Sequence, residues 1–223
     1  MSKALILLAS NSKEVKKLNI SKQAMLMDKD VDVTFANKEY DYITLINKTP
    51  ITPKEARDIG GNMVKKYKAK VEEIVFNLPD FPSDVKEGAA LAAYEFNKYK
   101  TNPKENKLKI EAAGISTSIN FARDLVTEPG NALYPEEYAH RINETLTPLG
   151  VNVRIIYQPE LERIGMDMLL SVGLGSEHNS AVVVMEHLHG AKDEEPLALV
   201  GKGVTFDTGG ISLKPGRNMG DMK

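Results

Sequence analysis

The residues best suited to chemistry lie in one glycine-rich stretch near the end of the sequence. Leu197–Lys223 reads LALVGKGVTFDTGGISLKPGRNMGDMK and places Lys202, Asp207 and Lys214 among closely spaced glycines. Glycines around a lysine and an aspartate indicate a backbone that turns tightly or approaches a ligand closely. The apolar run Leu197–Val200 predicts a buried strand just before them, and α/β proteins usually bind their ligands beyond such strand ends.

A phosphate-binding loop is one explanation of a Gly-Lys pair after a strand, but the surrounding residues argue against it. Pro196 stands where the pattern needs its first glycine, and Gly203 follows the lysine where a serine or threonine should bind magnesium. The dinucleotide-binding pattern fails as well, because His178 occupies the third glycine position after Gly173-Leu174-Gly175. We therefore do not expect a nucleotide site.

A metal site is the sharper interpretation. A carboxylate such as Asp207 can bridge two divalent ions about 3.5–4 Å apart, which is the spacing that a two-metal hydrolase needs. A lysine binds metal only as the neutral amine, so the pKa of Lys202 would have to fall, as a nearby dication and burial both cause. A plain salt bridge between Lys202 and Asp207 fits the same spacing, so the spacing alone leaves both interpretations open.

The wider sequence favours the metal interpretation through a resemblance. Gly201–Pro215 (GKGVTFDTGGISLKP) closely resembles the signature of the leucyl aminopeptidase, or cytosol aminopeptidase, family of two-metal enzymes with a lysine among the metal ligands. Three earlier segments resemble that family in the same order along the chain: Glu87–Lys100, Asn120–Pro129 and Met168–Gly175. The resemblance thus extends from about residue 87 to the end.

The resemblance implies a role for four residues. Lys202 would be a terminal ligand to one metal ion and Asp207 would bridge two, with zinc or manganese as the ions. Lys214 would polarise the scissile carbonyl and stabilise the oxyanion, which suits a fixed positive charge. Met222 would line the pocket for the first side chain of the substrate, although an ordinary loop or core methionine fits as well. The family further implies peptide substrates, a preference for leucine-like N-terminal residues, and a homohexamer.

Part of the expected site is missing from the sequence. The family's next metal-binding aspartate would fall shortly beyond Lys223, and no Asn-Thr-Asp-Ala-Glu-Gly-Arg motif is present. We therefore expect a chain that alone neither binds metal tightly nor turns over substrate. It would be a truncated or cleaved portion of a longer protein, or a second chain would carry the missing catalytic half. The competing interpretation is a non-catalytic N-terminal binding or assembly module, DNA-binding included, with an inert partial site.

Composition excludes several other classes. There is no cysteine, so disulfide scaffolds and thiolate sites are excluded. The formal charge is −2, from 29 basic and 31 acidic residues, which gives no reason to expect a nucleic-acid partner. The basic pair Lys16-Lys17 and the basic run Lys65–Lys70 are then more simply solvated faces. The apolar run Ala4–Ala9 is too short for a signal peptide or a membrane span, so we expect a cytoplasmic protein without membrane contact. The pair His187 and His189 precedes a polar turn and is more simply solvated than a metal site.

The elements predict an α/β fold: an N-terminal α/β domain (1–109), a helical linker (110–149) and the incomplete start of a larger α/β catalytic domain (150–223). In the first part, strands are expected at Ala4–Ala9, Val31–Ala36, Tyr42–Asn47 and Val71–Phe76. Helices are expected there from Pro53, after the capping residue Thr52, to about Lys68 and at Glu87–Tyr99.

The linker is expected to hold one helix over 115–126, which Glu128-Pro129-Gly130 must end, and another from Pro135 to Leu146. The last part is expected to hold strands at Val151–Tyr157, Ala181–Met185 and Leu197–Val200, with a helix at Glu160–Leu169.

Overall fold

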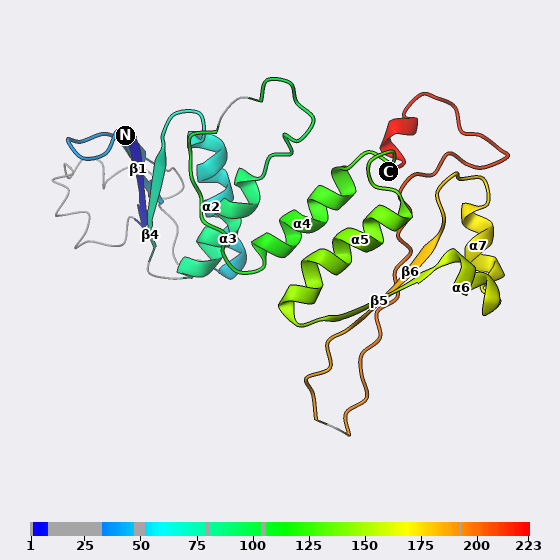
Figure 1. The fold of residues 1–223 in the computed structure, drawn as a ribbon. Helices are drawn as coiled ribbons and strands as arrows, with labels where there is room; N and C mark the ends of the chain where they lie inside the picture. Colours follow the sequence, from blue (N-terminus) through cyan, green and yellow to red (C-terminus); the bar gives the residue numbers. More distant parts are fainter. Residues whose placement is uncertain (1, 9–32, 47–51, 79–80, 104–105, 192) are drawn as a thin grey trace. The chain divides into compact units, whose positions relative to one another are not determined.

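The computed structural model describes residues 2–8, 33–46, 52–78, 81–103, 106–191 and 193–223. Contacts divide the chain into two units, Met1–Arg123 and Asp124–Lys223, which are described separately below (Figure 1). The division falls inside helix α4 (Ser116–Thr127). The three-part division at residues 109 and 149 stays a prediction.

The first unit is built on a four-stranded sheet in the order β2-β3-β1-β4. Its strands are β1 (Lys3–Leu8), β2 (Val33–Phe35), β3 (Tyr42–Ile46) and β4 (Glu73–Asn77). The central strand β1 runs parallel to β3 and to β4, whereas β2 is antiparallel to β3. All four lie where the sequence predicts strands; the predicted strand ends at Ala9, Val31, Asp32 and Asn47 lie outside the described residues.

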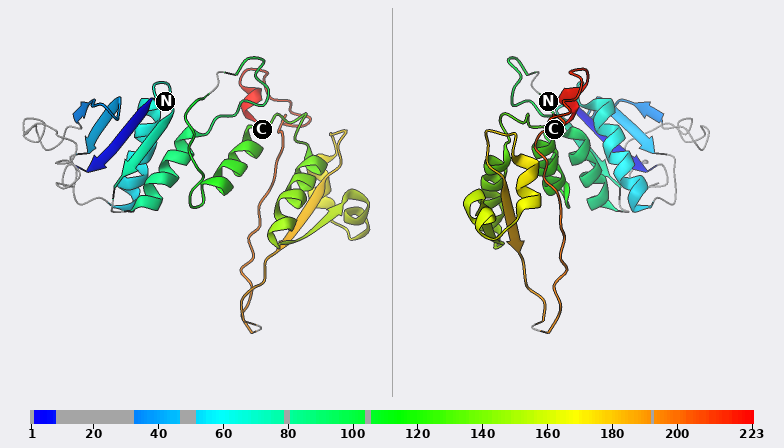
Figure 2. Two further views of the ribbon diagram at one scale, coloured as in Figure 1. Left: turned by 60° about the vertical axis from the view of Figure 1, so that its left-hand side comes forward. Right: turned by 90° about the vertical axis from the view of Figure 1, so that its right-hand side faces the viewer.

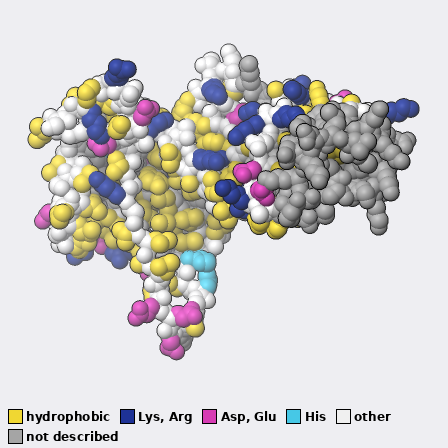
Figure 3. All heavy atoms as spheres, turned by 180° about the vertical axis from the view of Figure 1, so that it is seen from behind, with side chains coloured by type: hydrophobic (Ala, Val, Ile, Leu, Met, Phe, Trp, Pro, Cys, Tyr) yellow, Lys and Arg dark blue, Asp and Glu magenta, His cyan; other side chains and the backbone are white. Residues whose placement is uncertain are grey.

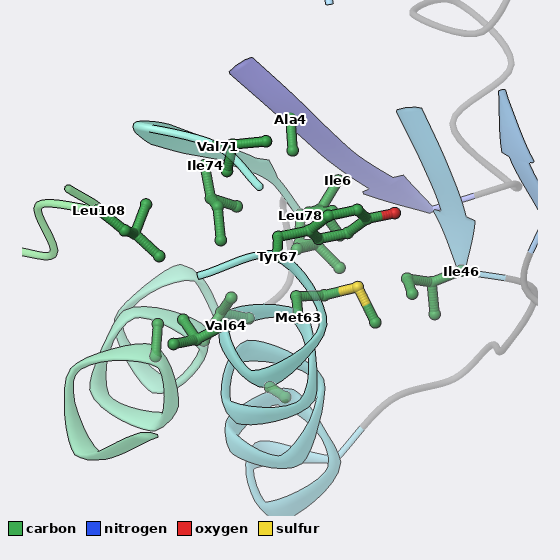
Figure 4. Close-up of a cluster of buried hydrophobic side chains, with 13 residues drawn as sticks. Ala4, Ile6, Ile46, Met63, Val64, Tyr67, Val71, Ile74, Leu78 and Leu108 are labelled. Carbon is green, nitrogen blue, oxygen red and sulfur yellow. The ribbon is translucent and has the colours of Figure 1, made fainter. Parts of the chain in front are cut away.

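The same unit contains two helices, α2 (Pro53–Tyr67) and α3 (Pro82–Ala93), which pack against each other. The predicted capping box starts α2, because the Glu55 amide donates to Thr52 Oγ1 and the Thr52 amide donates to Glu55 Oε2. Buried side chains from the sheet and from α2 then form one core, in which Val64 and Tyr67 face Ile6 (Figure 4). The Tyr67 hydroxyl remains satisfied there, 2.6 Å from Thr44 Oγ1.

Helix α3 differs from its predicted span, Glu87–Tyr99. It begins earlier, with Pro82 in its first turn, and it ends at Ala93 because Tyr94 adopts extended backbone angles (φ −55, ψ 132). The Arg123 guanidinium donates to the Leu91 carbonyl, 2.7 Å away, and stacks over the Tyr94 ring at 5.4 Å. A side chain 32 residues away thus satisfies a carbonyl of the last turn, which local sequence patterns do not encode.

The second unit contains the end of α4, helix α5 (Pro135–Leu146), a 3₁₀ turn η2 (Thr147–Leu149) and the antiparallel pair β5 (Asn152–Tyr157) and β6 (Ala181–Glu186). Helix α5 packs against both strands (Figure 2). These helices and strands match their predicted positions. Between the strands, the predicted helix Glu160–Leu169 is instead two helices, α6 (Gln158–Arg163) and α7 (Asp167–Gly173), because Gly165 has a left-handed φ of 75.

The prediction of a buried strand at Leu197–Val200 is wrong. The segment is irregular, and Leu197, Leu199 and Val200 are 86%, 87% and 99% exposed. A strand forms only where a neighbour takes its backbone hydrogen bonds, and in the described part of this unit β6 pairs only with β5. The apolar side chains of this segment are therefore exposed. Figure 3 shows one face of the molecule, on which many hydrophobic side chains, in yellow, lie at the surface.

Across the described residues, no helix has both the length and the apolar character needed to cross a membrane.

Candidate functional site

The segment Gly201–Lys223 folds back on itself so that its middle and its end meet. The Asp207 amide donates to the Met222 carbonyl at 2.9 Å, next to the 3₁₀ turn η3 (Met219–Asp221). The Lys214 amide donates to the Thr208 carbonyl, also at 2.9 Å. Gly209 permits this turn, because it has a φ of +94 and a Cβ there would lie 2.5 Å from the Ser212 carbonyl oxygen.

The Lys214 ammonium lies at the centre of this fold. Its Nζ is 2.8 Å from Asp207 Oδ2, 3.2 Å from the Asp207 carbonyl oxygen and 3.5 Å from Met222 Sδ. The other carboxylate oxygen, Asp207 Oδ1, accepts the Gly209 amide at 2.9 Å. Three of the four residues singled out from the sequence are thus brought together by one short segment.

The electrostatics favour an ionised aspartate. The pKa of Asp207 lies below its ordinary value, first because Lys214 donates a hydrogen bond to it and then because the Gly209 amide does. The ammonium charge of Lys214 adds to this effect, and the charge of Lys202 contributes last. The carboxylate is also 55% exposed, so it is both charged and open to a cation.

Lys202, the fourth residue, is exposed and acts on Asp207 only through its charge. Among the residues that the structure describes, no three histidine, aspartate or glutamate side chains form a group that could hold a metal ion. Lys202 and Asp207 therefore match the chemistry of two metal ligands, but a two-metal centre needs more donors than the described residues bring together.

The segment lies against the turn between α4 and α5, where the sequence predicts a helix stop and where the family-like segment Asn120–Pro129 ends. A Cβ at Gly130 would lie 2.7 Å from the Phe206 Cβ, and a Cβ at Gly203 would lie 3.1 Å from the Tyr138 ring. Lys223 Nζ donates to the carbonyl of Thr127, the last residue of α4, at 2.7 Å. No local pattern in the sequence relates Gly130 to Phe206, so this contact could not be predicted.

The histidines lie elsewhere in the second unit. The rings of His187 and His189 meet edge to face, with centroids 4.2 Å apart, on an exposed stretch after β6. His178 stacks on Tyr134 with centroids 3.8 Å apart, and its Nδ1 is 3.7 Å from Glu136 Oε2. Neither arrangement joins the Asp207 cluster, and both histidines of the pair are exposed.

Two domain profiles of one family match the sequence. The N-terminal domain of the cytosol aminopeptidase family matches residues 38–103, and the catalytic domain of the same family matches residues 120–223. Among curated relatives, the cytosol aminopeptidase of Rickettsia prowazekii is 46% identical over 163 residues, which is 65% of this chain and 33% of that protein. A probable cytosol aminopeptidase of Rickettsia typhi is 38% identical, over 81% of this chain and 43% of the relative. The chain thus spans well under half the length of these relatives.

Solved structures show the same fold. The bottromycin maturation enzyme BotP, determined in complex with Mn, superposes with a TM-score of 0.73 and 21% sequence identity. That match covers 100% of this chain and 52% of BotP. At this identity the likeness concerns the fold, an α/β architecture shared with the N-terminal half of such enzymes.

Proposed function

We propose that this chain, which belongs to the cytosol aminopeptidase family, supplies the N-terminal domain and the first metal-binding segment of a two-metal aminopeptidase. The enzyme would release N-terminal residues from peptides, with leucine-like residues preferred. The observation that carries the proposal is the contact of the Lys214 ammonium with both Asp207 and Met222. It places a fixed positive charge, an anionic ligand and an apolar side chain within one short segment.

The donor chemistry of this segment suits divalent ions. Asp207 offers an ionised and exposed carboxylate, and Lys202 offers an amine once its proton is lost. We assign Asp207 as the bridging ligand and Lys202 as a terminal ligand, with zinc or manganese as the ions. The Mn-bound BotP structure supports manganese as one of these choices. Bound ions would supply an activated water and a Lewis acid.

The other residues of the site act on the substrate. Lys214 would donate from Nζ to the scissile carbonyl and stabilise the negative charge that develops on its oxygen. This role suits an ammonium held by Asp207 on one side and partly open to solvent, with a side chain 34% exposed. Met222, with its sulfur next to that ammonium, would contact the first side chain of the substrate. A flexible thioether adapts to branched apolar groups, which supports the leucine-like preference.

The rest of the proposal follows from family membership. Relatives named cytosol aminopeptidase support a cytoplasmic location and peptide substrates. A homohexamer is part of the same proposal. The donors and the arginine that this sequence lacks would be supplied by further sequence of the same gene or by a second chain.

The full-length product of the gene tests this function. We expect it to hydrolyse leucine amide when Mn²⁺ or Zn²⁺ is supplied and to lose this activity with a chelator. Lys214→Ala should lower kcat by about 10²–10³-fold, the effect of removing one oxyanion donor. Arg217→Ala, which removes a positive charge from the same segment, is the matched control and should retain activity.

A full-length product that is inert with either ion would contradict the proposal and favour a non-catalytic assembly module. Unchanged turnover in Lys214→Ala would overturn the role assigned to Lys214.

A further inference from the structure

The turn between α4 and α5 is held together by its own hydrogen bonds. The amides of Ala132 and Leu133 both donate to the Pro129 carbonyl at 2.9 Å, and Leu133 is only 4% exposed. Helix α5 begins directly afterwards, with Pro135 in its first turn. We call Thr127–Tyr134 the α4–α5 corner.

A buried ion pair joins the two sides of this corner. The Glu128 side chain is 3% exposed, and its Oε1 lies 2.7 Å from Nη1 of Arg141, which comes from α5. Arg141 also binds Glu137 through Nε at 2.7 Å and donates from Nη2 to the Ala132 carbonyl at 3.4 Å. One guanidinium therefore links α5 to both the start and the middle of the corner. A carboxylate this deeply buried is stable only while its partner stays in place.

The segment Gly201–Lys223 touches this part of the fold at three points, and each lies one residue from a proposed site residue. Gly203 meets the Tyr138 ring next to Lys202, and Phe206 meets Gly130 next to Asp207. Lys223 donates to the Thr127 carbonyl next to Met222. Figure 1 shows the end of the chain, in red, beside the turn between the two helices. The positive Lys223 at a helix C-terminus is also electrostatically favourable.

We propose that Glu128 and Arg141 are positioning residues of the site. Their ion pair fixes the α4–α5 corner, the corner seats the Gly201–Lys223 segment, and Gly130 sets how closely Phe206, and with it Asp207, approaches. Gly130 is required for this close approach, because a Cβ 2.7 Å from the Phe206 Cβ is shorter than real contacts allow. No left-handed backbone angle is involved there. The effect of this positioning on catalysis rests on the proposed function. The placement of the Gly201–Lys223 segment by the corner does not.

Hydrogen exchange in the 223-residue chain tests the geometry directly. The reporters are the Asp207 amide, bonded to Met222, and the Lys214 amide, bonded to Thr208. Gly130→Ala should speed exchange at both by about tenfold, because the displaced Phe206 opens the segment locally. Gly175→Ala is the matched control, since a Cβ there meets nothing within 4 Å, and it should leave both amides unchanged. Amides of the β5–β6 pair serve as the internal reference.

A second variant separates the ion pair from the glycine contact. Glu128→Gln keeps the size of the side chain but removes its charge, so Arg141 loses one of its two carboxylates. We expect the same two amides to exchange faster in Glu128→Gln as well. Unchanged exchange at Asp207 and Lys214 in Glu128→Gln would overturn the positioning role of the ion pair, and unchanged exchange in Gly130→Ala would overturn the role of the close contact with Phe206. Equal acceleration of the β5–β6 amides would overturn the whole inference, because the corner would then stabilise the whole unit rather than position the segment.

Kinetics of the full-length product complete the test. Gly130→Ala should lower kcat for leucine amide by about 10²-fold with KM little changed, since a misplacement of about 1 Å in a catalytic group has that effect. A full-length product without peptidase activity would refute the proposed function but leave the exchange result standing. An active product whose kcat is unaffected by Gly130→Ala would refute the positioning role alone.

Discussion

Lys214 Nζ lies 2.8 Å from Asp207 Oδ2, so the group proposed to polarise the substrate carbonyl is directly paired with the group proposed to bridge two metal ions. The same ammonium also reaches the Asp207 carbonyl oxygen and the Met222 sulfur. A divalent ion at the proposed metal ligand Asp207 would therefore compete with Lys214 for this carboxylate.

This competition predicts that loss of the Lys214 charge tightens metal binding. In the full-length gene product, Lys214→Gln should lower the Kd for Mn²⁺ by about two- to fivefold. This change corresponds to the interaction free energy of a partly exposed ion pair. Isothermal titration of the metal-depleted protein measures it. Arg217→Gln removes a charge from the same segment, but Lys214 and Lys202 are the cations that lower the pKa of Asp207, so this variant should leave the Kd unchanged. An equal or weaker affinity in Lys214→Gln would show that the two cations do not compete.

The fold of the Gly201–Lys223 segment depends on Gly209, where the backbone is left-handed and there is no room for a Cβ atom. Gly209→Ala should open the turn, because a left-handed alanine costs about 1–2 kcal/mol and its Cβ would press on the Ser212 carbonyl. Exchange of the Lys214 amide should rise by about tenfold. Gly216→Ala is the control, since its Cβ would meet open space. Equal exchange rates in the two variants would contradict the structure of this turn.

Alanine substitution at two neighbouring glycines of α2 should have different effects on the free energy of unfolding. A Cβ at Gly60 would collide with the Val85 carbonyl of α3, whereas a Cβ at Gly61 would lie 3.4 Å from its nearest neighbour, the Gly88 carbonyl oxygen. Gly60→Ala should lower the free energy of unfolding by about 2 kcal/mol through overpacking. Gly61→Ala should change it little or raise it by about 0.5 kcal/mol, because alanine favours the helix.

Urea unfolding of the first unit, followed by tyrosine fluorescence, measures both variants. The protein contains no tryptophan, so the signal comes from its eight tyrosines, which include the buried Tyr67. A Gly60→Ala variant as stable as Gly61→Ala would show that the two helices are further apart than described.

The first unit should also lose stability in acid through Glu95. The pKa of this carboxyl lies below its ordinary 4.5, first because Lys68 donates a hydrogen bond to it and then because Asn97 does. A depressed carboxyl pKa adds stability that is complete above the unfolded value and is lost as pH falls through the folded one. Lys68→Met should therefore destabilise the unit at pH 7, by about 0.5 kcal/mol for a partly exposed pair.

That difference should vanish once the pH lies well below 4.5, because Glu95 is then neutral in both proteins. Thermal unfolding at several pH values measures it. A Lys68→Met effect of constant size across this range would mean that packing, rather than charge, accounts for it.

Local patterns in the sequence were sufficient for most of the elements. Thr52, Pro53 and Glu55 encode the start of α2 within four residues, and the structure confirms both hydrogen bonds of that capping box. The alternation of aliphatic and polar residues likewise located the strands of both units. Such signals act over one or two turns and need no knowledge of the remaining fold.

The predicted end of α3 was wrong, because the helix stops at Ala93, where Arg123 from a distant helix donates to a carbonyl of the last turn. The predicted strand at Leu197–Val200 was wrong as well, because a strand depends on a partner that no local pattern supplies.

The candidate site divides in the same way. The types and order of Lys202, Asp207, Lys214 and Met222, and the resemblance of the segments around them to the family, could be obtained from the sequence alone, whereas the metal-binding and catalytic roles of these residues stay predictions. Only the tertiary structure decided that Lys214 turns back to Asp207 and that Gly130 receives Phe206 from 76 positions further along the chain. The physical reason is the distance along the chain over which each feature is defined. The chemistry of a side chain depends on its residue type alone. A contact between residues far apart in the sequence exists only once hydrogen bonds and buried charges hold both partners in place.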